Sequence, residues 1–103
     1  MNFFKQLFGG GVNADLKNII AAGALLVDVR TPGEFAEGHV KGSVNIPLDR
    51  VQSQLATFKN RKNIIVFCRS GGRSSQAKSI LEQNGFTNVV NGATWNNVGQ
   101  YIN

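Results

Sequence analysis

Cysteine and histidine are nearly absent from this sequence, which has one of each, Cys68 and His39. A single cysteine excludes a disulfide within the chain and any all-cysteine metal site. Because one histidine and one cysteine leave few soft metal ligands, we expect no metal and no other cofactor. An unpaired thiol also favours a reducing compartment, since disulfides form mainly in secreted proteins.

Long apolar runs are missing as well. The apolar residues at positions 1–8 are interrupted by Lys5 and Gln6, and three glycines follow them. A secretory signal needs an apolar core of about 7–15 residues, and a membrane-spanning helix needs about 20. We therefore expect no stable membrane insertion and a cytoplasmic protein, or a periplasmic one if a signal sequence has been removed. Residues 1–11 are predicted as a short amphipathic segment, with a weak membrane or partner contact through its phenylalanines as the alternative.

Acidic residues are fewer than basic ones, six against eleven, which gives a formal net charge of +5. A positive balance suits nucleic acid and anionic small substrates equally. The densest basic stretch, residues 59–62, has no interleaved aromatic residues on which bases could stack. We therefore predict a solvated loop there and no nucleic-acid partner.

The rest of the sequence alternates short apolar runs with amphipathic stretches, which indicates one α/β domain over residues 12–103. The apolar runs are β-branched and typical of strands buried on both faces of a parallel sheet. They lie at 25–29, 43–46, 63–68 and 88–91. The stretches of helix type lie at 13–23, 31–38, 48–58, 74–84 and 95–102. This order predicts a central parallel sheet with helices on both faces.

Local signals mark the ends of some helices. Thr31 is predicted to cap the second helix, with Pro32 at its first position and Glu34 completing a capping box. Asn13 is the predicted cap of the first helix. Trp95, the only tryptophan, is predicted to lie in the core.

Cys68 follows the apolar strand at 63–68 and precedes a glycine-rich turn and a helix. Inward N–H groups of such a turn, together with the positive end of the helix, stabilise a thiolate. We therefore predict that Cys68 is a nucleophile and that the two arginines of the turn attract an anionic substrate. The predicted substrate-binding residues fill the turn: Arg69, Ser70, Gly71, Gly72, Arg73 and Ser74.

Asp28 and Cys68 both close strands, so both are expected at the edge where the carboxyl ends of parallel strands meet. We predict that Asp28 and Arg30 form a buried ion pair that braces this edge, rather than taking part in chemistry.

Two segments together resemble the rhodanese family of sulfurtransferases. Residues 28–47 contain an acidic strand end, a short helix, Gly-His and Asn-Ile-Pro, and residues 68–73 form the cysteine loop. The resemblance covers residues 12–103 and implies a single rhodanese-like domain with a five-stranded parallel sheet. It implies that Cys68 takes the outer sulfur of thiosulfate or a similar donor as a persulfide. Cyanide or a thiol, including a thioredoxin-like or other thiol protein, would then accept the sulfur, and His39 would be structural.

Two alternatives stay open. A sulfur-carrier or interaction module without turnover would use the same loop. A phosphatase or arsenate-reductase-like activity is less favoured, because such enzymes have a longer loop than the four residues between Cys68 and Arg73. The sequence departs from the family pattern at Gly92-Ala93, where two glycines are common, and at Ser43, where alanine is common. Neither departure is expected to touch the site.

Overall fold

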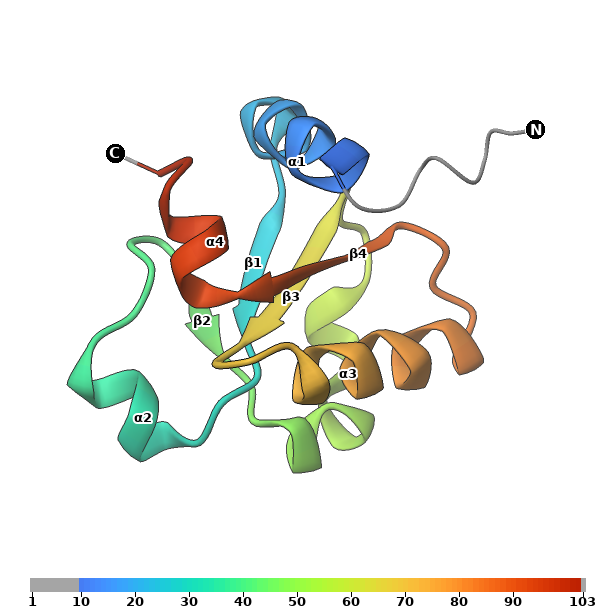
Figure 1. The fold of residues 1–103 in the computed structure, drawn as a ribbon. Coiled ribbons are helices and arrows are strands. Elements are labelled where there is room, and N and C mark those ends of the chain that lie inside the picture. The colour runs from blue at the N-terminus through green and yellow to red at the C-terminus, as the bar shows by residue number, and fades with distance from the viewer. Residues whose placement is uncertain (1–9, 103) are drawn as a thin grey trace.

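A parallel β-sheet lies at the centre of the computed structural model, which describes residues 10–102 (Figure 1). Its strands follow the order β2-β1-β3-β4. Their bounds are Leu25–Asp28 for β1, Val44–Asn45 for β2, Ile64–Cys68 for β3 and Val89–Thr94 for β4. The expected parallel α/β fold is therefore confirmed, whereas the expected number of five strands is wrong for the described residues. Each of the four apolar runs forms one strand, and the described sequence offers no fifth run of this type.

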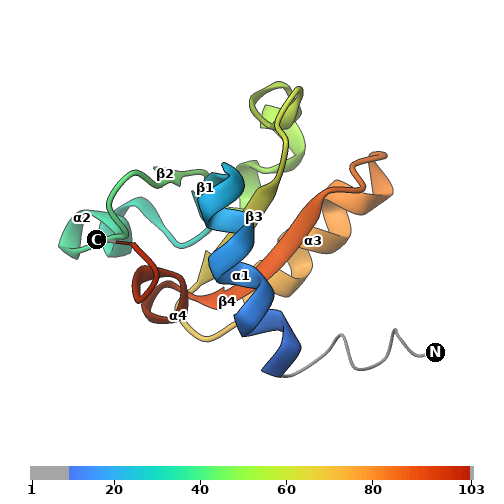
Figure 2. The same ribbon diagram turned by 90° about the horizontal axis from the view of Figure 1, so that it is seen from above.

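Helices cover both faces of the sheet, as seen from above in Figure 2. One face packs against α1 and α4, and the other packs against α3 and two 3-10 helices, η2 and η3. The short helix α2 follows β1 at the carboxyl edge of the sheet. The helix bounds are Gly10–Ala22 for α1, Pro32–Glu37 for α2, Leu48–Arg50 for η2, Gln52–Phe58 for η3, Gly72–Gln83 for α3 and Trp95–Gly99 for α4.

Strand β3 separates two hydrophobic clusters, because successive side chains of a strand point to opposite faces. Ile64, Val66 and Cys68 belong to the cluster under α3, and Ile65 and Phe67 belong to the cluster under α1 and α4. All five residues of β3 are buried. Strand β3, which ends at Cys68, is therefore held in position by hydrophobic packing on both of its faces.

The capping signals predicted from the sequence are confirmed at α2. The Thr31 hydroxyl accepts the N–H of Glu34 at 3.2 Å, and the Glu34 carboxylate accepts the N–H of Thr31 at 2.9 Å. Gly38 follows the last residue of the helix. This capping box fixes where Glu34 sits relative to the end of β1.

Other boundaries differ from the prediction. Helix α1 begins at Gly10, so Asn13 lies inside it rather than at its cap. The predicted helix over 48–58 consists of η2 and η3 instead, with non-helical dihedral angles at Gln54. The apolar positions there are spaced by three, four and three residues, and a spacing of three suits a 3-10 helix. The four-residue step spans the kink.

Some predictions fall outside the described residues. The amphipathic segment predicted at the N-terminus lies almost wholly within residues 1–9, which the structure does not describe. Within residues 10–102, no helix has both the length and the apolar character that crossing a bilayer requires.

Candidate active site

Cys68 ends β3, and its side chain has no exposed surface. The chain turns sharply after it, and α3 begins at Gly72. Gly71 takes a left-handed φ of +102° in this turn, a conformation that glycine adopts without a steric penalty. As a result, the N–H of Gly71 donates to Sγ of Cys68 at 3.0 Å.

Ser74 and Ala93 complete the surroundings of the sulfur. Sγ lies 3.6 Å from the Ser74 hydroxyl oxygen and 3.7 Å from the carbonyl oxygen of Ala93. The same hydroxyl is within hydrogen-bond distance of the carbonyl oxygens of Gly71, at 3.0 Å, and Ala93, at 3.3 Å. Ser74 is thus a buried link between the cysteine loop and β4.

The expectation that Gly92-Ala93 would not touch the site is wrong at Ala93. The register between β3 and β4 shifts between Val66 and Phe67, so that Phe67 pairs with Ala93 and Cys68 with Thr94. This bulge turns the Ala93 carbonyl toward Cys68. It also holds Ala93 at a φ of +69°, which is uncommon for a residue other than glycine.

The pKa of the Cys68 thiol is set by opposing influences. Burial raises it, whereas hydrogen bonds from the Ser74 hydroxyl and from the N–H groups of Ser74, Gly71 and Ser70 lower it. The hydrogen bonds prevail, so the pKa of Cys68 lies below its ordinary value. The sequence predicted that N–H groups of the loop would stabilise the Cys68 thiolate, and the direction of the pKa shift agrees with this. The Ser74 hydroxyl, which the sequence analysis had not considered for this role, lowers the pKa further.

Arg73 was predicted to bind an anionic substrate, but its guanidinium is already paired with a carboxylate. It forms two hydrogen bonds with the Glu34 carboxylate, at 2.7 and 3.1 Å, which join α3 to α2. The hydrogen bond from Arg73, together with the N–H of Thr31, lowers the pKa of Glu34 from 4.5 to about 2. Glu34 reciprocally raises the pKa of Arg73. The structure therefore pairs this predicted anion-binding residue with a carboxylate that sequence reasoning had assigned only to a helix cap.

The predicted ion pair between Asp28 and Arg30 is confirmed. Both side chains are almost fully buried, and Nη2 of Arg30 lies 2.7 Å from the Asp28 carboxylate. The same nitrogen donates to the carbonyl oxygen of Gly38 at 2.7 Å. The guanidinium also lies over the Trp95 ring, 4.4 Å from its centre. The prediction that Trp95 lies in the core is therefore only partly met: Arg30 covers its ring, but Trp95 also lines a cavity and is half-buried.

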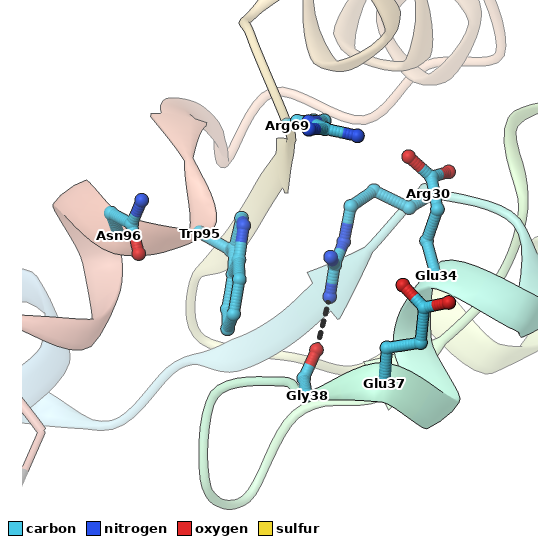
Figure 3. A pocket seen from close by; sticks show the side chains of 7 residues that line it. All are labelled: Arg30, Glu34, Glu37, Gly38, Arg69, Trp95 and Asn96. Atoms are coloured by element: carbon cyan, nitrogen blue, oxygen red, sulfur yellow. Dashed lines mark hydrogen bonds between the residues drawn. The ribbon is translucent and has the colours of Figure 1, made fainter.

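A cavity of about 390 Å³ opens at this edge of the sheet. Figure 3 shows Arg30 in its centre, between Trp95 and the glutamates of α2. Cys68 is not among the residues that line it, whereas its neighbour Arg69 is. The lining residues are Arg30, Glu34, Glu37, Gly38, Arg69, Trp95 and Asn96. Of these, Glu37 and Asn96 carry no signal that sequence reasoning could have used, since only the fold brings them to the cavity.

His39 occupies a structural position. Its Nδ1 lies 2.9 Å from the carbonyl oxygen of Phe35, and its ring stacks on the Phe35 ring with centres 3.8 Å apart. It does not line the cavity that Arg69 lines. Over the described part of the chain, no three His, Cys, Asp or Glu side chains gather as a metal ion would require.

The sequence profile of one family, described as "Rhodanese-like domain", matches residues 12–92. The thiosulfate sulfurtransferase PspE of Escherichia coli is 43% identical over 67 residues, which cover 63% of this chain and 64% of that protein. The match thus spans slightly less than two thirds of this relative's length. The chloroplastic thiosulfate sulfurtransferase 16 of Arabidopsis thaliana is 38% identical over 84 residues, 70% of each chain.

Solved structures have the same fold. A structure described as a rhodanese with anions, from E. coli, matches with a TM-score of 0.66 and 38% sequence identity. The match covers 72% of this chain and 89% of that one.

Proposed function

The chain belongs to the rhodanese-like domain family, and from this premise we propose that it is a sulfurtransferase in which Cys68 carries the transferred sulfur. The observation that supports this most directly is the buried Cys68 sulfur, which accepts the N–H of Gly71 at 3.0 Å. The names of its relatives from E. coli and A. thaliana support the same activity.

The proposed reaction is a double displacement. The Cys68 thiolate attacks the outer sulfur of thiosulfate, the sulfur–sulfur bond of the donor breaks, and sulfite leaves with the bonding electrons. The enzyme then carries a persulfide on Cys68. A nucleophile such as cyanide or a thiolate attacks the outer sulfur of this persulfide and restores the Cys68 thiolate. The N–H groups of the loop would stabilise the negative charge of the Cys68 thiolate and that of the Cys68 persulfide.

Donor recognition is proposed to depend on Arg69 more than on Arg73. Arg69 is exposed and lines the cavity, whereas the charge of Arg73 is balanced by Glu34. The pairing of Arg73 with Glu34 leaves less positive charge to attract a free anion. It therefore also favours a second candidate function, a sulfur carrier loaded by a partner protein. Such a carrier needs no site that attracts a free anion.

Intact mass measured after incubation with thiosulfate tests the proposal. We expect the mass to increase by one sulfur atom, and cyanide to remove that sulfur as thiocyanate over many cycles. The Cys68→Ala protein, checked for native circular dichroism, should gain no sulfur. A protein that takes up sulfur from a persulfide donor but does not turn over thiosulfate would support the carrier instead. Thiocyanate formation by the Cys68→Ala protein at the wild-type rate would contradict both.

A further inference from the structure

The Ser74 hydroxyl lies within reach of three acceptors and has one proton to donate. Its oxygen is 3.0 Å from the carbonyl oxygen of Gly71, 3.3 Å from that of Ala93 and 3.6 Å from Sγ of Cys68. Ser74 and Cys68 are both fully buried. A hydroxyl donates a single hydrogen bond and rotates to suit its partner. The acceptor that receives the proton therefore depends on how much negative charge each of the three carries.

The charge on Sγ changes during the proposed reaction. In the resting enzyme Sγ is a thiolate, whereas in the persulfide it is bonded to a second sulfur, which then carries the charge about 2 Å away. Sγ already has the nitrogen of Gly71 at 3.0 Å, the Ser74 hydroxyl oxygen at 3.6 Å and the Ala93 carbonyl oxygen at 3.7 Å. The outer sulfur must lie on the side that these three atoms leave open. Formation of the persulfide therefore moves the charge away from the Ser74 hydroxyl.

The two carbonyl groups give the hydroxyl proton another partner when Sγ is uncharged. The carbonyl of Gly71 is then favoured, because its oxygen is the nearest acceptor. When Sγ is a thiolate, a hydrogen bond to it is charge-assisted and roughly twice as strong as one to a neutral carbonyl. The opposing influences on the pKa of Cys68 agree with this: burial raises the pKa, and the Ser74 hydroxyl contributes the largest lowering effect.

We propose that the Ser74 hydroxyl is a catalytic group of the second displacement, in which it stabilises the departing Cys68 thiolate but not the persulfide. As the acceptor bonds to the outer sulfur, the bond between that sulfur and Sγ breaks and its electron pair passes to Sγ. The hydroxyl turns from the carbonyl of Gly71 to Sγ and keeps its proton throughout. This role rests on the proposed function, because it assigns a residue to one of its two steps.

The same hydrogen bond acts in the opposite sense on the first displacement. The Cys68 thiolate must give it up when it attacks the donor, so the hydroxyl does not accelerate loading. Sulfite makes the comparison direct, because its attack on the persulfide reverses loading by thiosulfate. In that reaction the lone pair of sulfite bonds to the outer sulfur, thiosulfate departs and Cys68 is again a thiolate. Removal of the hydroxyl should therefore shift this equilibrium toward the persulfide.

The equilibrium is measured by intact mass at fixed concentrations of thiosulfate and sulfite. The ratio of persulfide to thiolate is calculated with the thiolate fraction taken from the pH dependence of alkylation. We expect Ser74→Ala, checked for native circular dichroism, to raise this ratio about ten-fold. Ser74→Thr, which keeps a hydroxyl, should stay close to the wild type. Ser75→Ala, at the exposed neighbouring position, should leave the ratio unchanged.

The two half-reactions, measured separately, distinguish this role from a purely structural one. In Ser74→Ala, discharge by sulfite should be slower, whereas loading by thiosulfate, expressed per thiolate, should not be. Equal slowing of both steps would mean that Cys68 had been displaced, and would overturn the proposal. An unshifted equilibrium would also overturn it, whatever the change in the pKa of Cys68, because the hydroxyl would then stabilise thiolate and persulfide equally. Failure of the wild type to take up any sulfur would instead refute the proposed function, and this role with it.

Discussion

The hydroxyl of Ser74 is the side chain that distinguishes the environment of Cys68 from an ordinary buried thiol. Burial alone raises a thiol pKa, and this hydroxyl contributes the largest of the opposing effects. We predict that Ser74→Ala raises the pKa of Cys68 toward its ordinary value of about 8.5 or above it. The rate of alkylation by iodoacetamide as a function of pH measures this directly.

The neighbouring serine provides the control for this prediction. Ser75 is exposed, and only its backbone N–H bonds to the loop, at the carbonyl oxygen of Gly71. Ser75→Ala should therefore leave the inflection of the wild-type profile in place, below the ordinary cysteine value. A Ser74→Ala profile that coincides with the wild type would show that the loop's N–H groups suffice.

At the level of elements, the turn between β3 and α3 depends on the conformation of Gly71. An added Cβ would meet no atom within 4 Å, but φ is +102°. Gly71→Ala is therefore expected to lower the free energy of unfolding by about 1–2 kcal/mol, through backbone strain alone. Relaxation of that strain moves the N–H away from Sγ, so the pKa of Cys68 should rise as well. Urea denaturation and the alkylation profile measure the two effects.

Gly72 is the matched control for Gly71. An added Cβ there also meets nothing within 4 Å, and its φ is not in the left-handed region. Because Gly72 is the first residue of α3, Gly72→Ala should keep or slightly raise the stability. Equal destabilisation by both substitutions would contradict a specific conformational role for Gly71.

The ion pair between Glu34 and Arg73 joins α2 to α3 and makes stability depend on pH. Because the folded state lowers the pKa of Glu34 to about 2, its contribution is complete above pH 4.5. The contribution is lost as the pH falls from 4.5 through 2. Both side chains are partly exposed, so we expect Glu34→Gln to lower the free energy of unfolding at pH 7 by about 0.5–1 kcal/mol. The difference from wild type should vanish near pH 2.

Glu82→Gln is the control for this pair. Glu82 lies 3.6 Å from Lys78 on α3, and both side chains are more exposed than those of Glu34 and Arg73. Urea denaturation at pH 7 and at low pH should show little change for Glu82→Gln. A pH-independent deficit in Glu34→Gln would mean that a weaker capping box, in which the amide oxygen replaces the carboxylate, was responsible rather than the ion pair.

At the level of the whole molecule, Gly92 lies where the sheet meets α4. A Cβ there would come within 2.6 Å of Val98 and 2.9 Å of Ile65, both buried. Gly92→Ala is expected to destabilise the protein by about 1–3 kcal/mol through overpacking. Gly33→Ala, on an open position of α2, should have little effect. Thermal unfolding of the two variants compares them, and a stable Gly92→Ala protein would show that the bulge can shift.

The features that could be predicted from the sequence are those formed by residues close together in the chain. The capping box at Thr31, the ion pair of Asp28 with Arg30, and the position of Cys68 at a strand end all depend on residues close together in the chain. The pair of Glu34 with Arg73 spans 39 residues, and the approach of Ala93 to Cys68 spans 25. The latter depends on the register shift between β3 and β4, for which the sequence carries no local signal.

The burial of the chain's only thiol has a consequence for its oxidation. A cysteine whose pKa is lowered reacts readily with peroxide once peroxide reaches it, and forms a sulfenic acid. Many redox-sensitive proteins then form a disulfide with a second, resolving cysteine, but this sequence contains none. Rescue of an oxidised Cys68, before it proceeds irreversibly to the sulfinic acid, therefore needs a thiol from outside these 103 residues. The enclosure of Sγ by Gly71, Ser74 and Ala93 is thus also a shield that limits how often such rescue is needed.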